Sequence, residues 1–215
     1  MGEIVLVRHG QANSKATNEE DYDRLSALGH QQAEWLGAWM HAHEPSFDVV
    51  FSGTMRRHIQ TATSMGYAPQ HRDPRLNEMN YHALVDEMHA IKGVPGPANQ
   101  EEFIDHFMAT LAAWHEEEIA GAEPFARFEA RVADIMAEAA APGRRVLCLT
   151  SGGVIGMAIR TALGLDIERT AKILLPIYNS SVHRFHVSDR GIVLAGFNAL
   201  PHLDTPARRE ARTQL

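Results

Sequence analysis

A single cysteine is present among the 215 residues, which excludes a disulfide within the chain and makes a reducing cytoplasm the expected location. No apolar run approaches the roughly 20 residues that a membrane-spanning helix needs, so we expect no membrane partner. Basic residues are also scarce, since 20 Lys and Arg stand against 27 Asp and Glu. This balance disfavours a nucleic-acid partner, because proteins that bind nucleic acids carry basic patches. The first apolar run begins at residue 4, which leaves no room for a signal peptide in this sequence.

Hydrophobic residues make up 45% of the chain, enough for one domain with a substantial core. Short apolar runs predict strands at 3–8, 47–51, 144–150, 180–187 and 191–198. Apolar residues at helical spacing predict helices at 27–42, 54–65, 100–120, 124–141 and 153–163. Strands that alternate with helices predict an α/β fold, a three-layer α/β/α sandwich around a mostly parallel sheet of about five or six strands.

The first predicted strand ends abruptly on Arg8, His9 and Gly10. Ligands of open α/β sheets bind at the ends of strands, so this triplet lies where a site is expected. Gly10 lets the chain turn sharply and lets a ligand approach the backbone. A histidine there can attack an electrophile, and an arginine can hold an anion with its fork of donors. Taken alone, however, the triplet is equally typical of an ordinary polar turn.

Two other predicted strands end in a similar way. The run 49–51 leads into a helix with Arg56 and Arg57 in its first turn, and the run 146–150 leads into the turn Ser151-Gly152-Gly153. Helix N-termini after glycine-rich turns present free backbone N–H groups to anions. Together the three strand ends predict one phosphate site built from distant segments.

These motifs, in this order and spacing, resemble those of the histidine phosphatase superfamily, also called phosphoglycerate mutase-like. The Arg8-His9-Gly10 triplet is similar to that family's first signature, and Arg57-His58-Ile59-Gln60-Thr61-Ala62 resembles its second motif. Leu25-Ser26-Ala27-Leu28-Gly29, followed by Gln32-Ala33, resembles a helix start of the family. The resemblance extends to about residue 203. We therefore expect a single domain over 1–203 and a polar, poorly ordered C-terminal tail over 204–215.

The resemblance implies a role for each residue of the site. His9 would be the nucleophile that forms a phosphohistidine, and Arg8 and Arg57 would clamp the phosphate and neutralise its developing charge. Arg57 is favoured over Arg56 because it has the spacing to the Thr-Ala pair that the family shows. Glu78 falls at the position of the family's proton donor, and it must be protonated at working pH to act as one. Gln11 is a further candidate phosphate contact.

One departure from the family pattern concerns the turn after the third of these strands. The usual sequence there is His-Gly-Gly, whereas this chain has Ser151-Gly152-Gly153, as some branches of the family do. Ser151 can donate a hydrogen bond to a phosphate oxygen but brings no positive charge, and it is also a good helix cap. The loss of a charge-assisted contact costs about 1–2 kcal/mol of transition-state stabilisation, or roughly tenfold in rate.

The resemblance places a helical cap over the substrate at about residues 79–122. Between residues 76 and 126 the only Lys or Arg is Lys92, whereas acidic residues are plentiful. A substrate with several phosphates would require cations in this cover, so we expect a small monophosphate instead. No cofactor and no metal is implied. The pairs His41/His43 and His183/His186 are spaced so that their members do not share a face.

The leading hypothesis is therefore a cofactor-independent phosphatase that hydrolyses a small phosphomonoester through phosphohistidine. Two alternatives remain open: a phosphoglycerate mutase-like phosphoryl transferase, and a regulatory module that binds phosphate but turns over weakly or not at all. A serine hydrolase based on Ser151 is disfavoured, because the Gly-x-Ser-x-Gly pattern is missing. The sequence leaves the oligomeric state open, and a homodimer is compatible with it.

Overall fold

The computed structural model describes residues 2–13 and 22–214. Six strands form a central sheet. The strands are β1 (Gly2–Arg8), β2 (Val49–Ser52), β3 (His71–Arg72), β4 (Arg145–Thr150), β5 (Val182–Ser188) and β6 (Gly191–Ala199). Their order across the sheet is β3-β2-β4-β1-β5-β6. The four strands β3, β2, β4 and β1 run parallel, and β5 pairs antiparallel with both β1 and β6. The predicted mostly parallel sheet is confirmed, and its last two strands form an antiparallel pair.

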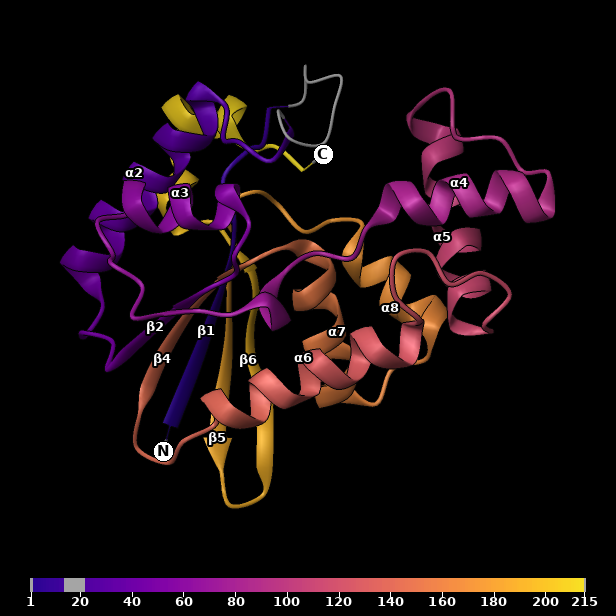
Figure 1. Ribbon diagram of the computed structural model, residues 1–215. Coiled ribbons are helices and arrows are strands. Elements are labelled where there is room, and N and C mark those ends of the chain that lie inside the picture. The colour runs from indigo at the N-terminus through magenta and orange to yellow at the C-terminus, as the bar shows by residue number, and fades with distance from the viewer. Residues whose placement is uncertain (1, 14–21, 215) are drawn as a thin grey trace.

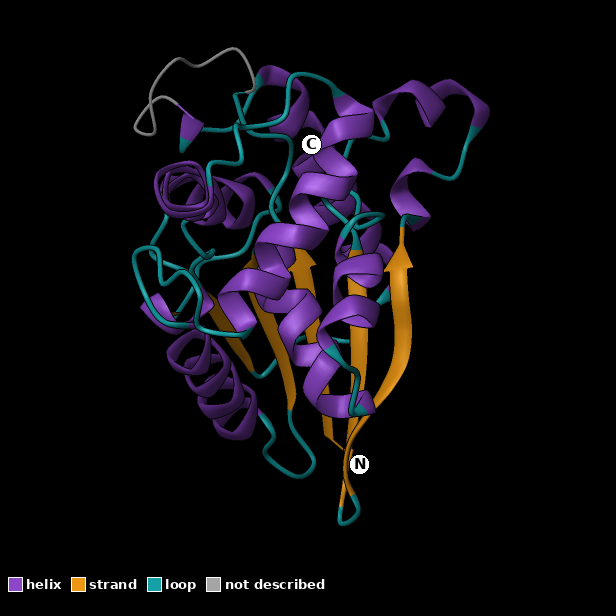
Figure 2. Cartoon of the chain, turned by 90° about the vertical axis from the view of Figure 1, so that its right-hand side faces the viewer, coloured by secondary structure: helices purple, strands orange, loops and turns teal. Residues whose placement is uncertain are grey.

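Helices cover both faces of the sheet, as Figures 1 and 2 show. β1 is buried on both faces, which explains its unbroken apolar sequence. Ile4 and Leu6 pack into the larger core with α6 (Phe125–Ala139) and α7 (Gly152–Leu163). Val5 and Val7 pack into a second core with α2 (Ala27–His43) and α3 (Arg56–Ser64). The three predicted layers are therefore present.

The cap lies beside the sheet rather than on either face (Figure 1). It consists of α4 (Tyr81–Lys92) and α5 (Gln100–His115), and α5 packs against α8 (Ile167–Leu174). The helix predicted over 100–120 ends earlier, at His115. No helix was predicted specifically at α4 or α8, because each buries only two residues and so has a short apolar stripe.

The C-terminal tail is ordered, so the expectation of disorder over 204–215 is wrong for its described part. Residues Pro206–Ala211 form a 3₁₀ helix. Beyond it, Thr213 accepts a backbone hydrogen bond from Asn179 (2.8 Å), and its hydroxyl donates to the side chain of Asn179 (2.8 Å). Gln32 of α2 donates to the carbonyl of Ala211 (2.7 Å). Buried side-chain partners thus hold a polar segment whose composition is typical of a loose end.

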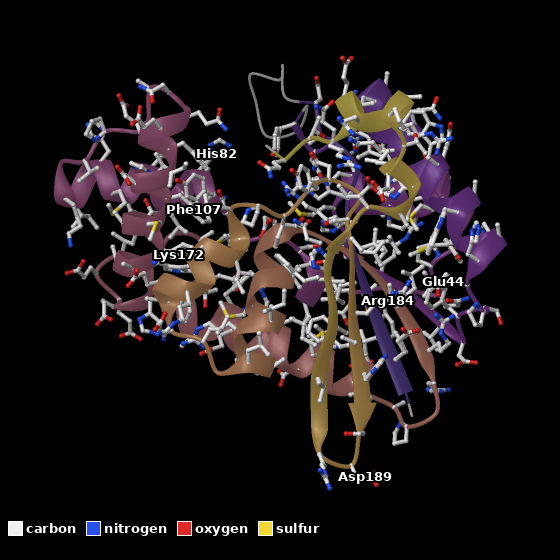
Figure 3. All side chains as sticks on the ribbon, turned by 180° about the vertical axis from the view of Figure 1, so that it is seen from behind. Glu44, His82, Phe107, Lys172, Arg184 and Asp189 are labelled. Carbon is white, nitrogen blue, oxygen red and sulfur yellow. The ribbon has the colours of Figure 1, made fainter. Side chains whose placement is uncertain are left out.

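An ion-pair network connects β1, the C-terminal end of α2, β4 and β5. Arg145 pairs with Glu3 (2.6 Å) and Glu44 (2.9 Å), and Arg184 pairs with the same two carboxylates. Figure 3 shows Glu44 and Arg184 on the side of the molecule away from the cap. None of the described helices is long and apolar enough to cross a membrane.

Candidate active site

The candidate site is a cavity of about 420 Å³ at the carboxyl ends of the parallel strands, between the sheet and the cap. Five of the seven predicted site residues line it, namely Arg8, His9, Arg57, Glu78 and Gly152. β1 and β4 are neighbours in the sheet, so Arg8 pairs with Thr150 in register and the two strand ends lie together. Of the remaining two, Gln11 lines an adjoining small hollow and Ser151 is completely buried behind the cavity.

His9 is held with one imidazole nitrogen occupied and the other available. Its Nδ1 lies 2.7 Å from the carbonyl oxygen of Gly10, which can only accept, so Nδ1 carries the proton and Nε2 does not. Burial, together with the nearby cations Arg57 and Arg8, lowers the pKa of His9 well below its usual value. The imidazole is therefore neutral near pH 7 and suited to nucleophilic attack.

The family-like motifs hold the loop that carries His9. Gly10 donates to the hydroxyl of Thr61 (3.1 Å), which itself donates to the carbonyl of Arg57 (2.7 Å). A Cβ atom on Gly29 would lie 2.1 Å from the carbonyl oxygen of Gln11, so only glycine fits where α2 meets this loop. Gln32 accepts from the backbone N–H of Gln11 (2.8 Å). The motif residues outside the cavity thus fix the backbone on either side of the histidine.

Two buried arginines supply the positive charge. Arg57 donates to Asp23 (3.0 Å), and Arg8 donates to the carbonyl of Ile177. The Nε atoms of both arginines are buried and have no hydrogen-bond partner among the described residues. Buried donors of this kind suit an anion in the cavity. Arg56 is exposed and does not line the cavity, so Arg57 is the arginine of this helix that faces it.

Asp23 is a functional neighbour that we did not predict. Its carboxylate accepts from the backbone N–H groups of Arg56 (2.9 Å) and Arg57 (3.3 Å), and so it caps α3 from outside the helix. The same carboxylate holds the Arg57 guanidinium. The sequence contains no signal for this role, because the cap is more than 30 residues away in the chain rather than at the helix start.

Glu78 lies at the N-terminus of α7. The N–H of Gly153 donates to both of its carboxylate oxygens (3.1 Å each). A negatively charged or hydrogen-bonding group is favoured at a helix N-terminus, which explains this placement. Glu78 also stands close enough to Arg8 to raise the pKa of that guanidinium against the lowering effect of burial. One carboxyl group, two arginines and two imidazoles, those of His9 and His82, therefore line a shared cavity.

Ser151 and Gln11 are engaged by other protein groups. The Gln11 side chain accepts from the hydroxyl of Ser26 (2.8 Å), next to the main cavity. Ser151 Oγ lies 2.6 Å from Nε2 of His58, a fully buried residue of α3. The His58 ring also lies beside the His9 ring, with 5.7 Å between the ring centroids. We did not predict a role for His58, although it lies inside the Arg57–Ala62 motif.

The part of the cavity beneath the cap is mainly apolar and aromatic. Its lining comprises Tyr22, Met79, Tyr81, Val85, Pro97, Phe103, Phe107 and Leu174, together with His82 and Asn80. Figure 3 shows His82 and Phe107 together on the cap. Phe103 and Pro97 also line an outer hollow that reaches Gln214. Lys92, the one Lys or Arg of the cap, pairs with Glu118 and does not line the cavity.

Other groups that attract attention in the sequence have structural roles or none. Burial raises the pKa of the Cys148 thiol to about 12, so this cysteine stays protonated in the core. Within residues 2–13 and 22–214, no group of three or more His, Cys, Asp or Glu side chains is arranged to hold a metal ion.

A histidine with a free Nε2, flanked by two arginines and a carboxyl group at the ends of parallel strands, defines the class of phosphate-handling α/β proteins that use histidine. The family model of the histidine phosphatase superfamily (branch 1) matches residues 4–200, and the chain belongs to that superfamily. A 2,3-bisphosphoglycerate-dependent phosphoglycerate mutase of Corynebacterium efficiens is 36% identical over 93 residues. This match covers 39% of the chain and spans only 37% of the mutase.

Solved structures of low sequence identity share the fold. The product of the open reading frame Rv3214 of Mycobacterium tuberculosis superposes with a TM-score of 0.69 at 20% identity, covering 93% of this chain and 98% of that one. A phosphoserine phosphatase of Entamoeba histolytica gives 0.61 at 18% identity, covering 94% and 100%. A mycobacterial glucosyl-3-phosphoglycerate phosphatase in complex with VO3 gives 0.63 at 21%, covering 92% and 98%.

Proposed function

We propose that this protein is a phosphomonoesterase that acts through a phosphohistidine on Nε2 of His9. The observation that carries the proposal is the hydrogen bond from His9 Nδ1 to the Gly10 carbonyl. It leaves a neutral Nε2 in a cavity with the two arginines that an attacking imidazole requires to neutralise the phosphoryl group. The phosphatases among the structural relatives and the matching family model support the same reaction class.

The reaction has two steps. In the first, the Nε2 lone pair attacks phosphorus, the phosphorus–oxygen ester bond breaks, and protonated Glu78 gives its proton to the leaving oxygen, which departs as an alcohol. In the second, Glu78 takes a proton from water, the resulting oxygen attacks phosphorus, and the bond to Nε2 breaks to release phosphate. Arg8 and Arg57 hold the phosphoryl oxygens in both steps. Ser151 and the backbone N–H of Gly152 complete the phosphate site.

The cavity also favours a class of organic group. Since its outer part is lined by Tyr81, Phe103 and Phe107, and no Lys or Arg of the cap reaches it, an uncharged apolar or aromatic group fits best. The adjoining hollow beyond Phe103 gives room for such a group to extend. We therefore propose aryl or bulky alkyl monophosphates rather than bisphosphorylated or carboxylate-bearing substrates.

Hydrolysis of 4-nitrophenyl phosphate by the wild-type protein and by His9→Ala tests the enzyme assignment. We expect turnover in the wild type and loss of at least a thousandfold in the variant, because His9 is the proposed nucleophile and alanine cannot form the phosphohistidine. Protein-bound label from a ³²P-labelled monoester that survives an alkaline quench and is lost in acid identifies the phosphohistidine. Turnover that survives His9→Ala, or label on another residue, would overturn the proposal.

The same experiment separates the two alternatives. A phosphoglycerate mutase-like transferase is favoured by the similarity to the Corynebacterium mutase, and it would pass the label to 2- or 3-phosphoglycerate faster than to water. A binding module would bind vanadate at His9 and form no label at all. A phosphatase gives the label, releases it to water, and prefers aryl phosphates over the phosphoglycerates.

A further inference from the structure

A second histidine stands at the phosphate site, and it comes from a different segment than the resembled family pattern implies. His58 lies on α3, one residue after Arg57, and is fully buried. Its Nε2 lies 2.6 Å from Ser151 Oγ, at the N-terminus of α7. The two residues are 93 positions apart in the chain, so the fold, not local sequence, creates this pair.

The surroundings of His58 indicate which of its nitrogens carries the proton. Its Nδ1 is buried and has no hydrogen-bond partner among the described residues. A buried N–H without an acceptor is rarer and more costly than a buried acceptor without a donor, which favours the tautomer with the proton on Nε2. Burial, with a smaller contribution from Arg57, lowers the pKa of His58 well below its usual value, so the ring is neutral.

With this tautomer, His58 donates from Nε2 to Ser151 Oγ. The hydroxyl oxygen of Ser151 is then occupied as an acceptor, and its own proton must point elsewhere. Ser151 precedes Gly152, which lines the cavity beside Arg8. Ser151 itself is fully buried one residue behind this lining, and its side chain makes no capping hydrogen bond to α7, so its hydroxyl proton is available to an acceptor that enters beside Gly152.

We propose that His58 and Ser151 together replace the second histidine of the family pattern, with Ser151 donating to the transferring phosphoryl group and His58 orienting that hydroxyl. This inference rests on the proposed phosphatase function. Ser151 is the contact residue, and His58 is a positioning residue that acts through it. The pair compensates for the missing histidine at position 151 with a polarised hydroxyl, since a donor that is itself hydrogen-bonded becomes a stronger donor.

The geometry also predicts that positions 58 and 151 cannot both hold an imidazole ring. Because only 2.6 Å separates His58 Nε2 from Ser151 Oγ, an imidazole at 151 would overlap the existing ring. Gly53 closes the other side, as a Cβ atom there would lie 2.1 Å from His58 Nδ1, so the ring has no room to retreat. A histidine at 151 is therefore expected to function only when His58 is made small.

A double-mutant cycle tests the coupling. We expect His58→Ala and Ser151→Ala each to lower kcat for 4-nitrophenyl phosphate about tenfold or more, with KM changed less than about threefold, because the lost contact acts mainly in the transition state. The double variant should be no slower than Ser151→Ala alone, because both changes remove one contact. His58→Gln, whose amide N–H reaches the position of Nε2, should keep kcat within about threefold of the wild type. Thermal unfolding of each variant checks that it folds.

A residue swap provides the second, independent test. Ser151→His alone should be slower than the wild type, and His58→Ala with Ser151→His should recover at least tenfold over Ser151→His alone. If His58 has only a structural role, the swap should recover stability but not kcat. Equal kcat in His58→Ala and the wild type, or multiplicative losses in the double-mutant cycle, would overturn the proposal.

The outcomes distinguish this inference from the proposed function. If wild-type turnover depends on His9 but not on His58, the proposed phosphatase function is supported and the proposed role of His58 and Ser151 is wrong. If the wild type turns over no monoester, orthovanadate affinity of the same variants decides: we expect about tenfold weaker binding for His58→Ala and recovery in the swap. Unchanged vanadate affinity across the series would then overturn the pair as well.

Discussion

At the residue scale, His9 combines a fixed tautomer with a pKa lowered by burial and by Arg57 and Arg8. Attack needs the neutral imidazole, so lowering its pKa extends activity toward acid. We expect the acid limb of kcat/KM for 4-nitrophenyl phosphate to have its midpoint below pH 6.5, the ordinary value for histidine. The measurement is kcat/KM between pH 4 and 8, with the ionisation of the substrate titrated separately. A midpoint at or above 6.5 would contradict it.

The proton-donor role proposed for Glu78 can be tested by substitution. Glu78→Gln keeps the size of the side chain but cannot donate or accept the catalytic proton, so kcat should fall about 100-fold for an alkyl phosphate, whose leaving oxygen needs that proton. The loss should be smaller for 4-nitrophenyl phosphate, because nitrophenolate leaves without protonation. Glu102→Gln is the matched control, since Glu102 is exposed at the start of α5. Equal losses on both substrates would argue against a proton donor at residue 78.

The roles of some site residues could be predicted from the sequence, whereas those of others could not. Arg8, His9 and Gly10 lie at the end of a strand, so a strand-end site was predictable from local sequence alone. Neither Asp23 nor His58 has a local signal of that kind, because each acts on a segment that the fold brings to it. Long-range contacts of this type depend on how helices are set against the sheet, and no periodicity in the chain encodes them.

At the element scale, the N-terminus of α7 and Glu78 depend on each other. A Cβ atom on Gly153 would lie 2.1 Å from Glu78 Oε1, so Gly153→Ala must move the carboxylate. Because the obstacle is the end of a flexible side chain, the variant should fold, with a Tm within a few degrees of the wild type. We expect kcat on an alkyl phosphate to fall about as far as in Glu78→Gln, roughly 100-fold. Gly153→Ala in the Glu78→Gln background should add little, and a further large loss would separate the two effects.

Cap residues that line the cavity should determine substrate specificity. Phe103 lines both the main cavity and the outer hollow, whereas its neighbour Ile104 is 42% exposed and lines neither. Phe103→Arg would place a cation where the cap has none, so kcat/KM for 3-phosphoglycerate relative to 4-nitrophenyl phosphate should rise about tenfold. Ile104→Arg is the matched control and should leave the ratio unchanged. An equal rise in both variants would indicate long-range attraction rather than a contact in the cavity.

The predicted elements that proved accurate share a physical basis. Strands β1, β4 and β5 and helices α2, α6 and α7 each bury a long apolar stripe, which is what a sequence pattern reports. β3 has two exposed residues and pairs only at the sheet edge, so it has no pattern of its own. α4 is defined by its ends instead, since Asn80 caps its start and Gly93 ends it with a φ of 69°.

At the scale of the whole molecule, the C-terminal tail and the catalytic loop form one connected structure. Asn179 is bound to Thr213 of the tail and donates to the carbonyl of His9 (3.5 Å), which also accepts from the N–H of Ser180 (3.1 Å). Gln32 bridges the tail to the other side of the same loop through Gln11. The tail composition suggests disorder because most of its residues are polar or charged, yet hydrogen bonds to buried partners order it.

Buried histidines make the stability of the whole fold depend on pH. His183 accepts from the backbone N–H of Asn198 (3.3 Å) and His202 lies against the Ser180 hydroxyl (2.8 Å). Burial is the main cause that lowers the pKa of each to about 3, from 6.5 for an ordinary histidine. Above pH 6.5 both rings are neutral in the folded and unfolded states, so they give no pH dependence there. Between pH 6.5 and about 3 only the unfolded chain takes up the protons, so stability falls with pH.

Each of these two histidines should therefore lower the free energy of unfolding by about 2 kcal/mol between pH 7 and 5. His9 and His58, whose pKa values are also lowered, act in the same direction. Urea unfolding at pH 7, 6 and 5 measures the loss, and this window keeps most carboxylates ionised in both states. His183→Gln should reduce the slope by one proton, whereas His186→Gln, at an exposed position of the same strand, should keep it unchanged. A free energy of unfolding that stays constant from pH 7 to 5 would show that the buried imidazoles take up protons without unfolding.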